Sequence, residues 1–161
     1  MSIIDKLKTN IEATTGLPFV YGSAGDINRA LDYSPLPCVF VYLLTTTSVS
    51  DVNGQLHERA TVAAFFVNKT VFDFDGIENE GIIDEMKRRA FAWVAASRSD
   101  KTLTFGAVEN AQRVYDEISD ATVTGYAVQI TIEEIEGVGT CNAPETPNNN
   151  SSDGETTETE L

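Results

Sequence analysis

The stretch that decides the fold runs from Cys38 to Asn68. It reads CVFVYLLTTTSVSD over residues 38–51, VNG over 52–54 and QLHERATVAAFFVN over 55–68. The pair Asn53-Gly54 favours a two-residue type I′ turn, because both central residues of that turn need a positive φ. The stretch therefore predicts a long β-hairpin whose two strands meet at this turn.

The predicted turn also implies a register for the hairpin. Directly opposite residues then have numbers that sum to 107, so that Tyr42 faces Phe65 and Ser48 faces Arg59. Apolar residues meet near the base, and polar residues meet near the tip. Because a slip of one residue would move every side chain to the other face, this agreement supports the register.

The hairpin changes character along its length. Residues 40–44 and 63–67 are apolar on both faces, which predicts a base that is covered on both sides. The arm from Thr45 to Val62 is mostly polar or small, and its eight residues before the turn would extend about 27 Å. A two-stranded ribbon is only marginally stable alone, so we expect the arm to pack on another part of the chain or on another copy.

A helix is predicted before the hairpin. Ser2 and Asp5 resemble a capping box, and apolar residues recur at helical spacing from Ile3 to Thr14, with Gly16 as the stop. Residues 17–21 read as a short strand. Segment 22–36 reads as a surface loop, with a helical turn over 26–31 as the alternative, because it contains Gly22, Gly25, Asp26, Asn28 and Pro35.

A second helix and further strands are predicted after the hairpin. The helix begins near Ile77 or Asn79 and ends near Ser97, with an apolar stripe at Ile82, Met86, Ala90 and Trp93 that Ile83 and Val94 widen. Residues 103–108 read as a strand or a lead-in. Residues 111–118 and 122–134 are predicted to form an antiparallel pair that turns at Ser119-Asp120. Apolar and polar residues alternate along the last strand, which is typical of a sheet with one solvent-exposed face.

The order of elements predicts the fold class. Helix, hairpin, helix and hairpin favour an α+β fold, in which two main helices pack on one face of an antiparallel sheet that contains the long hairpin. We expect one α+β domain over residues 1–139. Residues 142–161 contain no aromatic residue, Val or Ile, so segment 140–161 is predicted to be a disordered acidic tail.

The chain is strongly acidic, with a formal net charge of −14. This excess of acidic residues argues against specific binding to nucleic acid, because a protein needs Lys and Arg to neutralise the phosphates. It also argues against binding to anionic membrane surfaces. The sequence contains neither a continuous apolar signal region nor a stretch of the ~20 apolar residues that span a bilayer. We therefore expect synthesis inside the cell.

Few residues suggest chemistry. His57 beside Glu58 could act as a general base or a ligand. The alternative is that His57 is an exposed strand residue with no chemical role. Asp73 and Asp75 could bind a divalent cation, but acidic residues before a helix N-terminus are the ordinary reading. Cys38 is expected to be a buried thiol, and with Cys141 it makes neither a disulfide framework nor a metal site. The sequence predicts no catalytic, cofactor-binding or metal-binding residue, and no enzyme.

Contact between subunits is the remaining prediction. The basic run Lys87-Arg88-Arg89 could dock an acidic neighbour, although it also suits the solvated face of a helix. The residues that we expect at subunit contacts lie on the hairpin arm and on this run; they are Thr45, Thr47, Val49, Asn53, His57, Arg59, Thr61, Lys87 and Arg88.

The arrangement over residues 1–137 resembles the tail terminator, or tail completion, proteins of long-tailed bacteriophages and their minor-tail and neck relatives. The resemblance lies in the order of elements. These are an amphipathic helix (IIDKLKTNI, 3–11), a Pro-rich lead-in to a long hairpin (SPLPCVFVYLL, 34–44), a single helix (GIIDEMKRRAFAWVAAS, 81–97) and a closing strand pair (AQRVYDEIS, 111–119, and GYAVQITIEEI, 125–135).

This resemblance implies a structural component of the virion tail or neck, made in the host cytoplasm. Such proteins form rings, typically hexameric, which cap the tail tube and provide the surface to which the head joins. The implied partners are copies of the chain itself, the tail tube protein and head-completion or connector proteins, with hairpin arms and sheet edges making the contacts. No cofactor is implied. The alternative is another non-enzymatic adaptor or binding module, such as a head–tail connector.

Overall fold

The computed structural model describes residues 2–23, 35–45, 48–52, 55–71, 76–115 and 122–134. Over these ranges the chain forms α1 (Ile3–Thr15), β1 (Phe19–Tyr21), β2 (Cys38–Leu43), β3 (Ser48–Val52), β4 (Gln55–Lys69), α3 (Ile77–Ser97), β5 (Leu103–Val114) and β6 (Val123–Glu134). The helical turn expected at 26–31, the pair Asp73 and Asp75, Cys141 and the tail over 140–161 lie outside the described residues.

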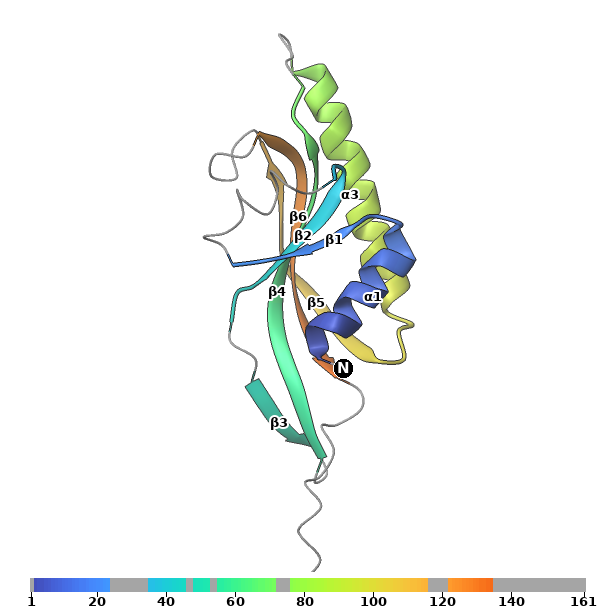
Figure 1. Ribbon diagram of the computed structural model, residues 1–161, viewed down its shortest axis with the longest axis vertical. Helices are drawn as coiled ribbons and strands as arrows, with labels where there is room; N and C mark the ends of the chain where they lie inside the picture. The colour runs from blue at the N-terminus through green and yellow to red at the C-terminus, as the bar shows by residue number, and fades with distance from the viewer. Residues whose placement is uncertain are drawn as a thin grey trace, which may run out of the picture.

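The described strands form one sheet with both helices on one face (Figure 1). The order is β1-β2-β4-β6-β5, and β3 pairs with the outer part of β4. All pairs are antiparallel except β1 with β2, which is parallel, so the sheet is mixed. The predicted α+β class is confirmed.

Local sequence signals account for the ends of α1. The Ser2 hydroxyl accepts a hydrogen bond from the Asp5 amide, and the Asp5 carboxylate accepts one from the Ser2 amide, which completes the predicted capping box. Gly16 ends the helix with φ +66°, where its amide donates to the Glu12 carbonyl. The helix extends one residue beyond the predicted end. The predicted limits of α3 are also confirmed.

The strand prediction after α3 was wrong in one respect. Residues 103–114 form a single strand, β5, and not a lead-in followed by a separate strand that starts at 111. Its register against β6 shifts on either side of Val108. Each such irregularity interrupts the period-2 alternation of side chains, so the sequence pattern reads as two pieces. The predicted turn at Ser119-Asp120 lies outside the described residues.

The hairpin register is confirmed at the arm and wrong at the base. Ser48 faces Arg59 as predicted. Tyr42, however, faces Ala63 instead of Phe65. The numbers of paired residues sum to 105 where β2 pairs with β4 and to 107 where β3 pairs with β4, so the register differs by two residues between the base and the arm. A shift of two residues leaves every side chain on its original face, so the apolar pattern could not reveal it.

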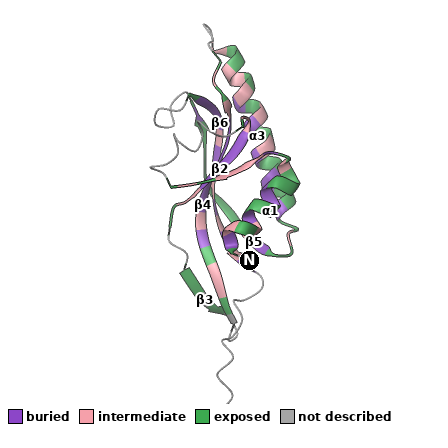
Figure 2. Cartoon of the chain, viewed as in Figure 1, coloured by how far each residue is buried: buried purple, intermediate pink, exposed green. Residues whose placement is uncertain are grey.

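The sheet is buried on both faces near the hairpin base, as predicted. Val39, Val41 and Phe66 join the core under the helices, where Trp93 is fully buried. Phe40, Phe65 and neighbouring residues form a second cluster on the opposite face. Figure 2 shows this burial along β2, β6 and the upper part of β4, whereas β3 is exposed.

A buried polar node joins the two helices. Asn10 of α1 accepts hydrogen bonds at Oδ1 from Trp93 Nε1 (2.8 Å) and from Ser97 Oγ (2.9 Å). Its Nδ2 donates to Asp100 at 2.6 Å, just beyond the end of α3. Burial raises the pKa of Asp100, but hydrogen bonds from Thr102, Asn10 and the Leu103 amide outweigh this effect and hold the pKa below its ordinary value.

Cys38 belongs to the second cluster and is fully buried, which confirms the predicted buried thiol. Burial raises the pKa of this thiol from 9.0 to about 11. The unfolded chain therefore loses the thiol proton at lower pH than the folded chain does. The resulting contribution to stability is complete below pH 9 and is lost as the pH rises through about 11.

Replacing Cys38 with Val is expected to remove this pH dependence. Between pH 8 and pH 10.5, the free energy of unfolding of the wild type should fall relative to that of Cys38→Val by on the order of 2 kcal/mol. Urea unfolding of both proteins at the two pH values measures the difference, in which all other titrating groups cancel. A gap that stays constant with pH would contradict the prediction.

Candidate interaction surface

The hairpin arm extends beyond the end of the main sheet. Strand β6 pairs with β4 from Arg59 to Lys69, and among the described strands β3 alone pairs with residues 55–58 of β4. The unsupported arm is thus residues 48–52 and 55–58 (Figure 1), shorter than the predicted 45–62. That prediction was wrong because β6 continues past the hairpin base and places Ile130 and Ile132 opposite Val62 and Ala60, which are buried.

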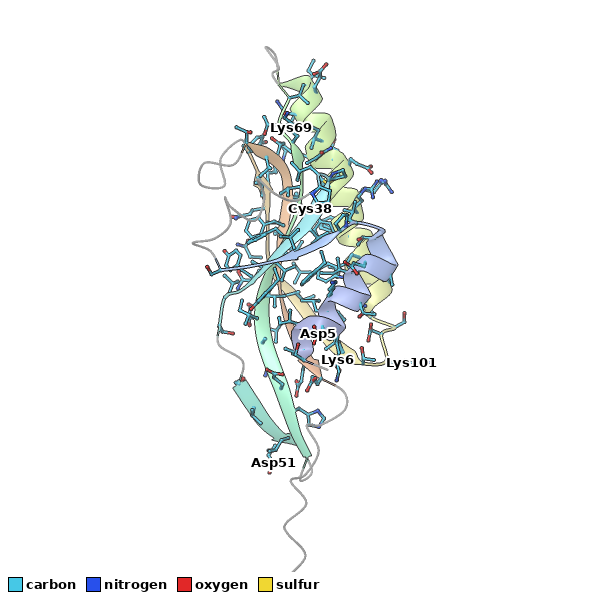
Figure 3. The ribbon with its side chains drawn as sticks, in the orientation of Figure 1. Asp5, Lys6, Cys38, Asp51, Lys69 and Lys101 are labelled. Atoms are coloured by element: carbon cyan, nitrogen blue, oxygen red, sulfur yellow. The ribbon has the colours of Figure 1, made fainter. Side chains whose placement is uncertain are left out.

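One face of the arm combines apolar and acidic side chains. Val49 pairs with Glu58 and Leu56 pairs with Asp51, so these four residues share one face. It continues the face on which Ala60 and Val62 pack under the helices. Val49 is 63% exposed and Leu56 is 47% exposed. Figure 3 shows Asp51 at the outer part of the arm, far from Lys69 at the other end of β4. We call these four residues the arm face.

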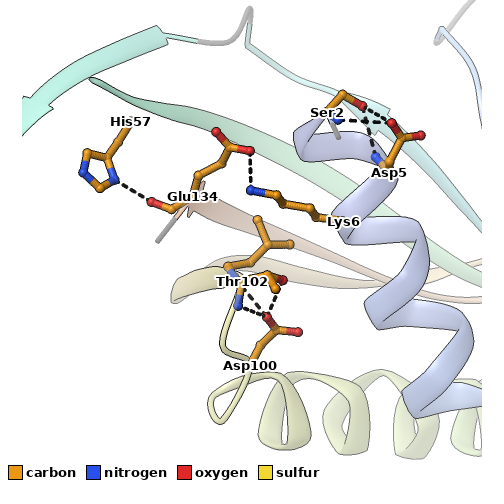
Figure 4. Close-up of polar contacts among 8 residues, drawn as sticks. Ser2, Asp5, Lys6, His57, Asp100, Thr102 and Glu134 are labelled. Atoms are coloured by element: carbon orange, nitrogen blue, oxygen red, sulfur yellow. Dashed lines mark hydrogen bonds and ion pairs between the residues drawn. The ribbon is translucent and has the colours of Figure 1, made fainter. Parts of the chain in front are cut away.

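The root of the arm is tied to α1 and to the end of β6. His57 Nδ1 lies 2.7 Å from the carbonyl oxygen of Glu134, and Lys6 Nζ lies 2.8 Å from Glu134 Oε1 (Figure 4). Glu134 is only 4% exposed, so the ammonium of Lys6 compensates a buried carboxylate. These contacts fix the direction in which the arm leaves the sheet.

The geometry separates the two residues of the possible catalytic pair. His57 and Glu58 are adjacent on a strand, and their side chains therefore point to opposite faces. The His57 ring contacts the Glu134 carbonyl instead. Together they form no acid–base dyad.

Other predicted contact residues engage their own chain. The hydroxyls of Thr61 and Thr131 lie 2.8 Å apart, and the Thr61 amide donates to Thr45 Oγ1 at 3.2 Å. Arg59 is exposed and lies opposite Glu133 in the register. Among the arm candidates, Val49 is the most exposed apolar residue, while Thr47 and Asn53 lie outside the described residues.

The basic run on α3 does not act as a single patch. Arg88 and Arg89 both contact the Glu85 carboxylate, with a shortest distance of 2.7 Å in each pair. Hydrogen bonds from Arg88, and then from Arg89, hold the pKa of Glu85 below its ordinary value. Lys87 lies apart from them, with Nζ 5.8 Å from the centre of the Phe91 ring. Lys87 therefore belongs to a different side of the helix.

That side of α3 borders a groove that the sequence analysis did not identify. Phe91, Val94, Ala95 and Arg98 line a hollow of about 370 Å³. A second hollow, of about 530 Å³, runs from Arg98 along β5 to Ala107. Phe91 is 46% exposed and contacts Tyr126 edge to face. An aromatic residue outside the buried stripe of a helix was the signal that could have revealed this groove.

Strand β5, along which the second hollow runs, carries further exposed apolar residues. Val108 and Ala111 face Ile130 and Val128 in the register, which places them on the helix-covered face of the sheet. Both are exposed. At the far end of β5, Arg113 bonds Glu80 of α3 at 2.9 Å, so this flank of the helix lies toward β5. We call Lys87, Phe91, Ala95, Arg98 and Val108 the groove face.

The described residues contain no group of three or more His, Cys, Asp or Glu side chains that could hold a metal ion. Among them there is also no helix with the length and apolar character needed to cross a bilayer. Exposed apolar and charged side chains lie together on the arm face and on α3. A scan against protein-family models matches no family, and a search of curated proteins finds no matching sequence.

Proposed function

We propose that this protein is a non-enzymatic structural subunit that forms a ring, typically of six copies, at the end of a phage tail tube and joins the tail to the head. The observation that carries the proposal is the arm, a two-stranded projection with Val49 and Leu56 exposed at its surface. Such a ribbon is marginally stable alone and gains stability when another surface covers it.

Two further features support the proposal. The Lys6–Glu134 ion pair and the His57 contact hold the root of the arm, as suits a projection that must reach a partner in a defined direction. The order of elements that resembles tail terminator proteins is present in the described residues, with the hairpin, α3 and the closing strands in place. The phage tail or neck is the location that this resemblance implies.

The oligomeric state tests the proposal directly. We expect the purified protein, alone or with the tail tube protein of the same particle, to assemble into a species of about six times the 17.5 kDa of one chain. Mass photometry gives the mass, and electron microscopy of tubes grown with the protein should show one ring at a tube end. A chain that stays monomeric at high concentration in both conditions would contradict the proposal.

A further inference from the structure

The arm face and the groove face have complementary chemistry. The arm face carries two apolar side chains, Val49 and Leu56, beside the carboxylates of Asp51 and Glu58. The groove face carries apolar Phe91 and Ala95, which lie along α3 between the cations Lys87 and Arg98, together with Val108 of β5. Apolar surface opposite apolar surface, flanked by opposite charges, is the pattern of a specific protein interface.

We propose that the arm face of one copy seats in the groove face of the next copy. This inference rests on the proposed function, because it assigns the contact through which the subunits assemble. Val49 and Leu56 cover Phe91 and Ala95, and the carboxylate of Glu58 lies near Lys87 or Arg98. In the subunit alone, Phe91 is 46% exposed. The contact removes this aromatic side chain from water.

The contact has a consequence for symmetry. The arm face lies on β3 and β4, and the groove face lies on α3 and β5, so each copy contributes a different surface to each contact. Such a heterologous contact repeats head to tail and generates a closed ring when the rotation between copies closes. An arm that paired with the arm of a second copy would instead produce a two-fold dimer.

The acidic tail is the competing occupant of a basic groove. Residues 142–161 carry five carboxylates but only one large apolar side chain, Leu161. The arm supplies charge and apolar surface together, whereas the tail supplies mainly charge. We therefore assign the groove to the arm, and we expect removal of residues 140–161 to leave self-association within about twofold of the wild type.

Two complementary variants test the contact. Val49→Ser with Leu56→Ser disables the arm, and Phe91→Ser disables the groove. Each is expected to weaken self-association about tenfold to a hundredfold, the range of central interface residues. Tyr21→Ser is the matched control, because Tyr21 is also 46% exposed but lies on β1 at the opposite edge of the sheet. It should assemble like the wild type.

Mixing the two disabled variants gives the sharpest result. The arm variant retains an intact groove, and the groove variant retains an intact arm, so an equimolar mixture should form a one-to-one dimer and no ring. Native mass spectrometry detects this dimer directly. If Phe91→Ser assembles like the wild type, or if the mixture stays monomeric well above the assembly concentration of the wild type, the proposed contact is wrong.

A charge exchange keeps the test valid if Phe91→Ser folds poorly. Glu58→Lys and Lys87→Glu, at exposed or half-exposed positions, should each weaken association at low salt. The double variant Glu58→Lys/Lys87→Glu should recover most of it. Absence of recovery, with circular dichroism melting curves unchanged, would count against the contact.

The outcomes separate this inference from the proposed function. If the wild type stays monomeric alone and with tail tube protein, both fail. If the wild type assembles but no arm or groove variant weakens it, the ring remains and only the arm–groove contact is excluded. If removal of residues 140–161 abolishes assembly while the arm variant assembles normally, the groove belongs to the tail and the proposed contact is wrong.

Discussion

Replacing Gly125 with Ala is expected to lower the free energy of unfolding by at least about 3 kcal/mol. Gly125 lies on β6 between Val67 of β4 and Val114 of β5. A Cβ atom at this position would lie 2.0 Å from the Phe66 carbonyl oxygen and 2.9 Å from the Val67 Cα. Both atoms belong to the backbone of β4 at the centre of the sheet, so no flexible side chain can move aside.

Gly81→Ala provides a matched control of opposite sign. Gly81 is exposed within α3, and an added Cβ would meet no atom within 4 Å. Alanine at an exposed helix position should therefore stabilise the protein by about 0.5–1 kcal/mol. Urea unfolding of both variants, followed by circular dichroism, measures the two changes. A Gly125→Ala protein as stable as the wild type would show that β4 and β6 can separate at this point at little cost.

The second large effect concerns Asn10. Replacing Asn10 with Leu is expected to cost about 3 kcal/mol, because Trp93 Nε1 and Ser97 Oγ would both lose their buried acceptor. Asp100 would lose the hydrogen bond that it accepts from Asn10. Thermal and urea unfolding measure the loss. Lys8→Leu is the control, because it places the same side chain at an exposed position of α1 and should change stability by less than about 0.5 kcal/mol.

A double-mutant cycle shows whether the node acts as a unit. Trp93→Phe removes the indole donor, so the further change Asn10→Leu should cost less in that background than in the wild type. We expect a coupling of about 1 kcal/mol between the two positions, within the range for residues that share a hydrogen bond. Strictly additive losses would mean that each residue contributes through packing alone.

Periodic patterns in the sequence were sufficient to predict most of the fold. The spacing of Ile3, Leu7 and Ile11 predicted α1, and the stripe with Met86, Ala90 and Trp93 predicted α3. The alternation around Val128, Ile130 and Ile132 predicted the buried face of β6. Each of these patterns reflects the face of one element that packs under the helices, and for this reason it is visible without knowledge of the partners. The opposite face of β6, where Val123 and Ala127 are also buried, was not predicted.

The features that depend on two elements at once were not predictable. The pairing of Tyr42 with Ala63 reflects a two-residue change of register between β2 and β3 along β4, and this shift preserves every face. The continuity of β5 was hidden by its irregular register near Val108. Val49 was among the contact residues expected from the sequence, whereas Leu56 was not, and the hollow beside Phe91 was not predicted.

The change of register between Leu43 and Ser48 allows the length of the arm to vary independently of the base. The base keeps its register through Leu43 and Val62, and the arm restarts at Ser48 and Arg59. Adding or removing one residue on each strand beyond that junction alters the reach by about 3.4 Å and inverts the arm face, whereas two residues per strand restore it. Variants that keep the arm face should therefore differ in arm length by whole steps of two residues per strand, and the reach of the arm changes without any change in the core.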